Sequence, residues 1–186
     1  MQDSTNKKKV NKDSRGYIQV YTGNGKGKTT AALGLALRAA GHGYRTFIGQ
    51  FLKGQKYGEL ASIKKLAPLI TIRQFGRKGF IHVDKDPDQI DITMAKNGLE
   101  ECRQAMFSGE YKIIVLDEIN VCIYFNVLEE KDVLEFLRQK PPEVEIVLTG
   151  RYAPDSFIAA ADLVTQMEEI KHYYTKKVQA RNGIEK

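Results

Sequence analysis

A glycine-rich run near the N-terminus carries the strongest chemical signal in the chain. Its glycines let backbone N–H groups approach a triphosphate closely, and a helix that begins at Lys28 adds free amides and a favourable dipole. The Lys28 side chain can reach phosphate oxygens, and the Thr29 hydroxyl is placed to bind Mg²⁺. We therefore predict a P-loop nucleotide-binding site in the run Thr22, Gly23, Asn24, Gly25, Lys26, Gly27, Lys28, Thr29 and Thr30.

Other interpretations of this run fit the residues less well. A strict P-loop begins with glycine where the chain has Thr22, but Gly27, Lys28 and Thr29 complete the pattern. A dinucleotide-binding fingerprint would need its third glycine where the chain has Lys28. A purely structural turn would not require Lys-Thr at the start of a helix.

A pair of carboxylates is the second signal. Asp117 and Glu118 end the strand-like run 111–116, and carboxylates in this place can bind Mg²⁺ or orient an attacking group. The pair alone is also typical of surface charges. Together with the P-loop it predicts a metal site formed by Thr29, Asp117 and Glu118.

Single polar residues follow two other predicted strands. Gln50 lies near the end of the second predicted strand, Lys53 follows that strand and Arg151 follows the fifth, where open α/β sheets bind ligands. Each alone is also typical of an ordinary loop. His172 lies in a basic C-terminal tail, and we expect it to be solvated.

Apolar runs and turn residues predict alternating strands and helices. We expect strands at residues 17–22, 45–51, 69–75, 111–117, 144–149 and 162–167. We expect helices at 28–40, 57–66, 90–107, 129–139 and 156–161, and a long loop at 76–88. The strands are continuous apolar runs, which favours an α/β fold with a mainly parallel sheet of about six strands and helices on both faces.

Net charge concentrates at the two ends of the chain. Residues 1–16 hold five Lys or Arg against two Asp, and residues 171–186 hold five against one Glu. These ends carry +3 and +4 of the net charge of +6, so residues 17–170 carry −1. A basic core would have favoured nucleic acid, and this distribution argues against it.

The length of 186 residues suits one domain, which we assign to residues 17–186 behind a flexible basic arm at 1–16. No run approaches the roughly 20 apolar residues of a membrane span, and the N-terminus is not typical of a secretory signal. We expect a cytoplasmic protein. Cys102 and Cys122 are predicted to be reduced thiols, without a disulfide or a zinc site.

Several segments taken together resemble the corrinoid adenosyltransferases, which make adenosylcobalamin. The resemblance covers about residues 16–185 in one order. It rests on Thr22-Gly-Asn-Gly-Lys-Gly-Lys-Thr-Thr-Ala-Ala-Leu-Gly34, Gly41-His-Gly43, Gln50-Phe-Leu-Lys-Gly54, Val115-Leu-Asp-Glu118, Leu148-Thr-Gly-Arg151, Ile170-Lys-His172 and Gln179-Ala-Arg-Asn-Gly-Ile-Glu185.

This resemblance implies a RecA-like P-loop fold, usually in a homodimer. It also implies that Co(I) of a reduced corrinoid attacks C5′ of ATP and that triphosphate leaves, so no side chain acts as general base. Arg151 becomes a further ATP contact, and Mg²⁺, or Mn²⁺ in its place, is expected at Thr29 and Glu118 with Asp117. The expected partners are ATP, the corrinoid and an electron-donating reductase or flavodoxin-like protein.

The corrinoid-facing loop departs from the family pattern. Phe80 and His82 are the candidate corrinoid-binding residues, but the family usually has Trp where this chain has His82. Gln166 stands where Glu is common, and no role is carried onto it.

Two other functions remain open at this point. A P-loop kinase or ATPase acting on a small molecule would release ADP instead of triphosphate. A non-catalytic nucleotide-dependent regulator using the basic ends on DNA or RNA would show steeply salt-dependent binding.

Overall fold

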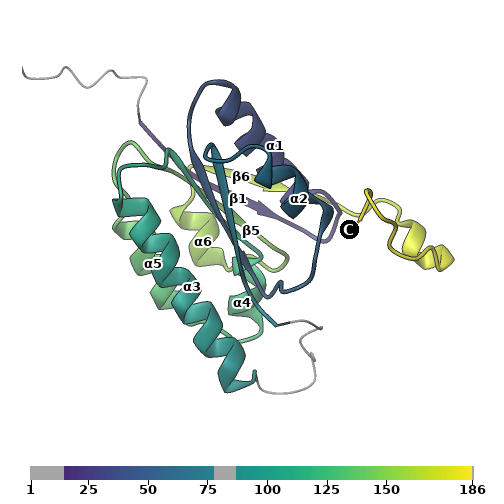
Figure 1. Ribbon diagram of the computed structural model, residues 1–186. Coiled ribbons are helices and arrows are strands. Elements are labelled where there is room, and N and C mark those ends of the chain that lie inside the picture. The colour runs from purple at the N-terminus through teal and green to yellow at the C-terminus, as the bar shows by residue number, and fades with distance from the viewer. Residues whose placement is uncertain (1–14, 78–86, 186) are drawn as a thin grey trace, which may run out of the picture.

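Strands and helices alternate along residues 15–77 and 87–185, which the computed structural model describes (Figure 1). The strands are β1 (Ile18–Thr22), β2 (Thr46–Phe51), β3 (Ile70–Phe75), β4 (Ile113–Asp117), β5 (Glu145–Thr149) and β6 (Leu163–Gln166). The helices are α1 (Lys28–Gly41), α2 (Gly58–Lys64), α3 (Gln89–Phe107), α4 (Ile119–Tyr124), α5 (Glu130–Arg138), α6 (Asp155–Ala160) and a short 3₁₀ helix, η2 (Tyr173–Lys176).

The strands form one six-stranded sheet in the order β3-β2-β4-β5-β1-β6, and every neighbouring pair is parallel. Nearly every residue of β2, β4 and β5 is buried, because helices cover both faces. This explains why the strands read as continuous apolar runs. The predicted parallel α/β sheet of six strands is therefore confirmed.

Two apolar cores lie on opposite faces of this sheet. On one face α1 and α2 pack their small and branched side chains, such as Ala36 and Ile63, against Ile48 and Val115. On the other face α3, α4, α5 and α6 share a larger core (Figure 1). There α3 approaches β3 so closely that a Cβ on Gly98 would lie 2.4 Å from the Phe75 ring.

The predicted elements occur within two residues of their expected ends. Two others were not expected. Helix α4 begins directly after Glu118 and is only six residues long. It spans fewer than two helical turns, so its apolar residues cannot repeat with a recognisable helical spacing. The 3₁₀ helix η2 lies in the C-terminal tail, where Lys and Tyr residues give no apolar period.

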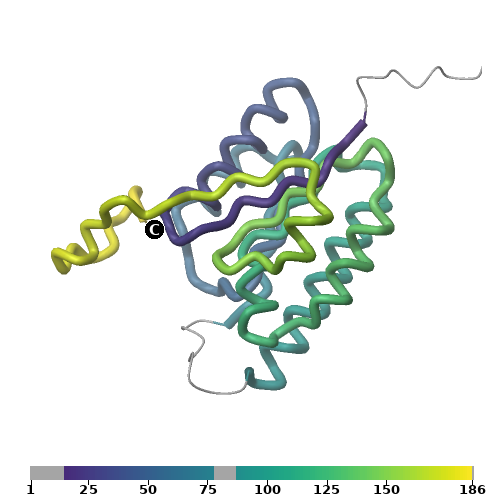
Figure 2. Tube along the Cα trace, turned by 180° about the vertical axis from the view of Figure 1, so that it is seen from behind, coloured from purple at the N-terminus to yellow at the C-terminus, as the bar shows by residue number. Residues whose placement is uncertain are grey.

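The parallel strand order places several loops together at the carboxyl edge of the sheet, where all six strands end. From β1 the chain crosses β5 and β4 to reach β2, whereas from β5 it crosses β1 in the other direction to reach β6. The carboxyl ends beside such a reversal are where open parallel sheets bind ligands. The segment after β6 projects beyond this same edge (Figures 1 and 2).

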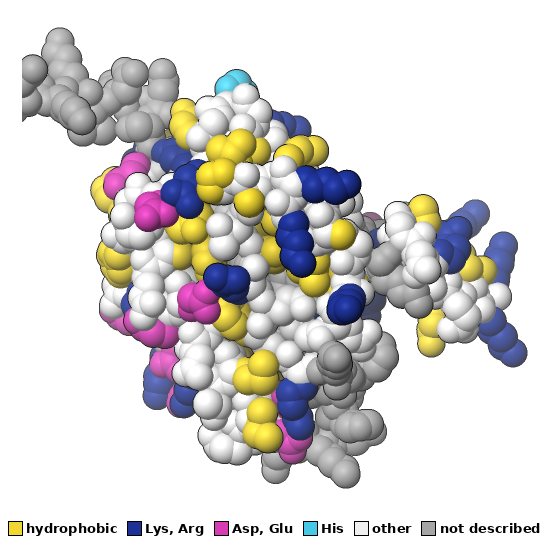
Figure 3. All heavy atoms as spheres, in the orientation of Figure 1, with side chains coloured by type: hydrophobic (Ala, Val, Ile, Leu, Met, Phe, Trp, Pro, Cys, Tyr) yellow, Lys and Arg dark blue, Asp and Glu magenta, His cyan; other side chains and the backbone are white. Residues whose placement is uncertain are grey.

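Charge is unevenly distributed on the surface. In Figure 3, Lys and Arg side chains mark the C-terminal segment and the side of α1 and α2, while Asp and Glu lie mostly toward α3 and α5. Among the helices within residues 15–77 and 87–185, none is long and apolar enough to cross a membrane.

Candidate functional site

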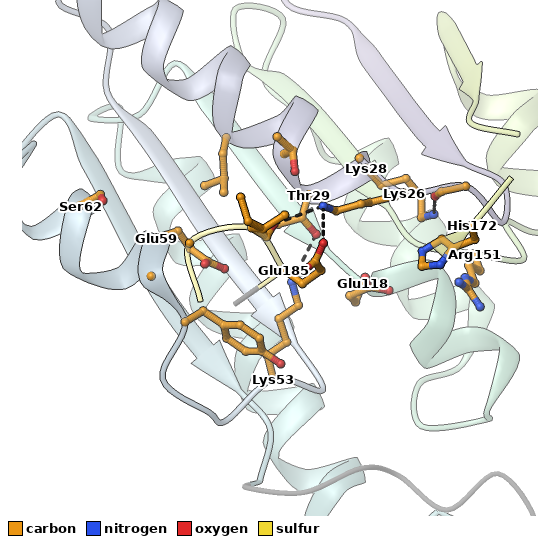
Figure 4. A pocket seen from close by; sticks show the side chains of 18 residues that line it. Lys26, Lys28, Thr29, Lys53, Glu59, Ser62, Glu118, Arg151, His172 and Glu185 are labelled. Atoms are coloured by element: carbon orange, nitrogen blue, oxygen red, sulfur yellow. Dashed lines mark hydrogen bonds and ion pairs between the residues drawn. The ribbon is translucent and has the colours of Figure 1, made fainter. Parts of the chain in front are cut away.

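A pocket of about 600 Å³ opens at the carboxyl edge of the sheet. This volume is in the range of small-molecule sites in proteins. Loops after four strands and the end of the chain contribute to it (Figure 4). Its wall includes residues 25–30 after β1, Lys53 after β2, Glu118 after β4, Arg151 after β5, and residues 183–185.

Two different constraints require glycine in the loop after β1. Gly27 has φ 116° where the chain turns into α1, a backbone conformation that other residues rarely adopt. A Cβ on Gly23 would lie 2.3 Å from the Met167 carbonyl oxygen. One on Gly25 would lie 2.7 Å from the Glu168 carbonyl oxygen. The segment after β6 therefore packs directly on the loop, and the Gly25 N–H donates to the Met167 carbonyl at 2.8 Å.

Two lysines of this loop have different partners. Lys28 is buried and donates to the carbonyl oxygens of Gly23 and Gly25 at 2.7 Å each. Burial lowers the pKa of Lys28, and Glu118 opposes that shift. Lys26 is more exposed and donates to the Glu185 carboxylate and the Ile184 carbonyl, both at 3.2 Å.

Asp117 lies beneath the pocket and is only 1% exposed. One carboxylate oxygen accepts hydrogen bonds from the Thr29 hydroxyl at 2.8 Å and the Thr149 hydroxyl at 2.7 Å. The other oxygen accepts from Lys53 at 2.7 Å and from Gln50 at 3.2 Å. Asp117 thus joins the first turn of α1 to the ends of β2, β4 and β5.

Glu118 follows in a left-handed conformation with φ 65°. This turn ends β4 and places the side chain in the pocket wall, while the Glu118 N–H donates to Thr149 Oγ1 at 3.0 Å. Burial raises the pKa of Glu118, and the neighbouring Asp117 carboxylate adds to the rise. Strained backbone of this kind is often retained at functional sites.

These oxygens have the chemistry of a magnesium site. Within residues 15–77 and 87–185, no three His, Cys, Asp or Glu side chains form a cluster that could hold a metal ion. Mg²⁺ in nucleotide sites is usually held by one or two carboxylates together with substrate phosphates. The Thr29 hydroxyl and the Asp117 and Glu118 carboxylates fit that requirement, and a cation, the Lys53 ammonium, already contacts two of them.

The structure brings most of the predicted site residues together. Residues 25–30, Glu118 and Arg151 line the pocket, and Asp117 lies below it. Thr22 instead supports the loop after β5, since its hydroxyl accepts from the Ala153 N–H at 3.3 Å. Gly23 and Asn24 begin the loop outside the pocket wall. The corrinoid candidates Phe80 and His82 lie outside the described residues.

Some residues of the site were not predicted from the sequence. Thr149 was overlooked, although a threonine ending an otherwise apolar strand beside Gly150 and Arg151 is a usable signal. The C-terminal tail was expected to be solvated, but His172 and residues 183–185 line the pocket. The tail reaches the pocket because Glu185 accepts a hydrogen bond from Lys26, while Arg181 and the Tyr173 hydroxyl, both within the tail, also donate to the Glu185 carboxylate.

The parallel sheet, the glycine-rich loop entering α1 and the carboxylates at the end of β4 define a RecA-like P-loop nucleotide-binding protein. A KaiC-like protein from the archaeon Pyrococcus horikoshii has a similar fold, with a TM-score of 0.57 and 20% identity over 92% of this chain and 76% of that one. Residues 14–185 match the family described as ATP:corrinoid adenosyltransferase BtuR/CobO/CobP, and the chain belongs to this family.

Three relatives that carry the name corrinoid adenosyltransferase agree with the family match. The corrinoid adenosyltransferase of Pseudomonas aeruginosa is 34% identical over 94% of this chain and 85% of its own length. That of a Sinorhizobium species is 35% identical over 93% and 81%. That of Escherichia coli K12 is 31% identical over 93% and 87%.

Proposed function

We propose that the chain transfers the 5′-deoxyadenosyl group of ATP to the Co(I) of a reduced corrinoid. The family match over residues 14–185 carries this proposal. In the reaction the cobalt electron pair forms the Co–C bond, the C5′–O bond breaks, and triphosphate leaves with the electrons of that bond. The products are an adenosylated corrinoid, such as adenosylcobalamin, and inorganic triphosphate.

The protein's contribution to this reaction is to hold and stabilise the leaving group. Residues 22–30 would bind the triphosphate through loop amides and through Lys26 and Lys28, and Arg151 would add a contact from the pocket wall. Fixed donors of this kind stabilise charge that develops in the transition state. No side chain needs to act as general base, because the metal of the substrate is the nucleophile.

Mg²⁺, or Mn²⁺ in its place, would be held by Thr29, Asp117 and Glu118. When bound, the metal neutralises charge on the triphosphate oxygens. The Thr149 hydroxyl orients Asp117, and the same hydroxyl accepts the Glu118 N–H.

The corrinoid would meet the segment that contains Phe80 and His82. On the two sides of this segment, Arg77 forms ion pairs with Asp88 and with Asp91, at the start of α3.

The proposal extends to the assembly and the setting of the protein. We propose a cytoplasmic homodimer, with residues 17–186 forming the catalytic domain and residues 1–16 a basic arm. A reductase or flavodoxin-like protein would supply the electron that generates Co(I). The exposed Leu163 and Val164 of edge strand β6 are consistent with a surface covered in a dimer.

One assay tests the proposed reaction directly. The protein is incubated with ATP, Mg²⁺ and chemically reduced cob(I)alamin without oxygen, and the products are separated by chromatography. Adenosylcobalamin and triphosphate are expected in equal amounts. ADP as the only nucleotide product, with unchanged corrinoid, would instead identify a kinase or ATPase.

A further inference from the structure

Lys53 contacts two of the side chains that would hold the metal. Its ammonium nitrogen lies 2.7 Å from Asp117 Oδ2 and 3.3 Å from Thr29 Oγ1. Hard oxygen atoms of this kind suit Mg²⁺ as well as an ammonium ion. The Lys53 ammonium thus lies between two oxygen atoms that would be ligands of a magnesium ion, and it fills the space that the ion would need.

Local structure holds Lys53 in this place. Leu52, directly before it, has φ 58°, so the chain turns sharply at the end of β2. The Lys53 side chain is 17% exposed, and its ammonium lies 5.6 Å from the centre of the Tyr57 ring. Burial by itself would lower the pKa of Lys53, but the Asp117, Glu118 and Glu59 carboxylates together outweigh it and the pKa is raised. The side chain is therefore charged at neutral pH.

The reason for such a contact is electrostatic. A buried carboxylate without a counter-ion costs several kcal/mol. Asp117 is almost fully buried, and Lys53 is the cation that pairs with it. Mg²⁺ needs oxygen ligands at about 2.0–2.1 Å, so it cannot share the Thr29 and Asp117 oxygens with an ammonium ion that lies between them.

We infer that Lys53 is a built-in competitor of Mg²⁺ for the Thr29 and Asp117 oxygens, so that the metal enters with the triphosphate and not before it. The phosphate oxygens then become the new acceptors of the displaced ammonium. Metal and triphosphate binding are coupled through Lys53 in addition to their direct contact with each other. This competition rests on the proposed Mg²⁺–ATP site and involves neither Phe80 nor His82.

Mn²⁺ binding without nucleotide tests this competition. Free Mn²⁺ is measured by electron paramagnetic resonance during titration of the wild type, Lys53→Met and Lys53→Gln. Lys56→Met is the matched control, because Lys56 is exposed in the same loop and does not line the pocket. Both Lys53 variants should bind Mn²⁺ more tightly than the wild type by roughly 5- to 150-fold, the usual range of coupling between linked sites. The control should match the wild type.

A second titration in saturating inorganic triphosphate completes the test. There the affinity gain of the Lys53 variants should shrink, since triphosphate has already drawn Lys53 away in the wild type. Equal or weaker Mn²⁺ binding by both Lys53 variants without triphosphate would overturn the inference. Circular dichroism checks folding, and Lys53→Gln keeps a neutral donor toward Asp117 in case Lys53→Met does not fold.

The result is separable from the proposed reaction. Tighter Mn²⁺ binding by the variants, together with no adenosylation by the wild type, would support the competition and reject the reaction. Adenosylation by the wild type with unchanged Mn²⁺ binding in both variants would support the reaction and reject the competition.

Discussion

Thr149, at the end of β5, donates a hydrogen bond of 2.7 Å to the Asp117 carboxylate at the end of β4. The same hydroxyl accepts the Glu118 N–H at 3.0 Å. Thr149 is fully buried, so water cannot replace either bond. One hydroxyl therefore fixes the positions of both carboxylate residues relative to the neighbouring strand.

Thr149→Val should weaken metal binding and lower the free energy of unfolding, while the protein still folds. Valine keeps the shape but leaves the Glu118 N–H unpaired, which costs about 1–3 kcal/mol of unfolding free energy. Loss of an orienting partner typically reduces metal affinity by roughly 10- to 100-fold. Mn²⁺ titration with triphosphate present measures this, and Thr149→Ser should keep wild-type affinity. A Thr149→Val protein with unchanged affinity would show that Asp117 is oriented by its other partners.

Sequence patterns predicted the strands, most helices and the P-loop because each depends on local residue types. Continuous apolar runs define buried parallel strands, and glycines followed by Lys28 and Thr29 define the phosphate loop. The Asp117 contacts with Gln50, Lys53 and Thr149 join strand ends far apart in the chain. They depend on strand order, which no local pattern contains.

The return of the C-terminus could not be predicted for a related reason. The tail has few apolar residues, and Ile184 is 57% exposed. Its position depends on the ion pair of Glu185 with Lys26, which lies far away in the chain. Composition alone therefore indicated a solvated basic tail.

Lys28→Met should impair the reaction far more than Lys26→Met. Lys28 is buried within the phosphate loop, whereas Lys26 is partly exposed and has several partners in the tail. Removal of one fixed donor to developing charge typically lowers kcat by about 10²–10³. Triphosphate release in the cob(I)alamin assay measures both variants. Similar losses of triphosphate release in both variants would mean that Lys26 and Lys28 stabilise the triphosphate charge equally.

Two helical glycines offer a matched test of packing. A Cβ on Gly98 in α3 would lie 2.4 Å from the Phe75 ring, whereas one on Gly34 in α1 has nothing within 4 Å. Gly34→Ala should therefore stabilise the protein by up to about 1 kcal/mol through helix propensity, a gain of about 2–4 °C in Tm. Gly98→Ala should lower Tm because the helix must move away from β3. Equal shifts in thermal unfolding would contradict the close approach of α3 to the sheet.

The two cysteines should be inert in the folded protein. Cys102 and Cys122 are fully buried free thiols, and burial raises the pKa of both well above the usual value. At pH 8 a thiol reagent should label neither in native protein and both in guanidinium chloride. Rapid labelling of either thiol in the native protein would place it at the surface.

The same thiols should make stability fall in alkaline solution. Their folded pKa lies above the unfolded value near 8.5, so unfolded thiols ionise first and stability is lost as pH rises above that value. A Cys102→Ala, Cys122→Ala double variant should be less stable throughout because of lost packing. Its Tm should nevertheless decline less steeply between about pH 8 and 10 than that of the wild type. Parallel declines would assign the alkaline loss to other groups.

The Glu185 carboxylate should compete with triphosphate for Lys26. Its pKa is lowered by the Arg181 backbone N–H and by Lys26, so it is ionised at neutral pH, and its side chain is 16% exposed. A partly exposed ion pair is weak, so Glu185→Gln should tighten inorganic triphosphate binding by up to about fivefold. Isothermal titration calorimetry measures this, with Glu143→Gln as a charge-matched control outside the pocket wall. The gain should shrink in high salt, because screening weakens the competing pair. Weaker triphosphate binding by Glu185→Gln would mean that the C-terminal segment closes over the anion and holds it, with the carboxylate keeping that segment in place.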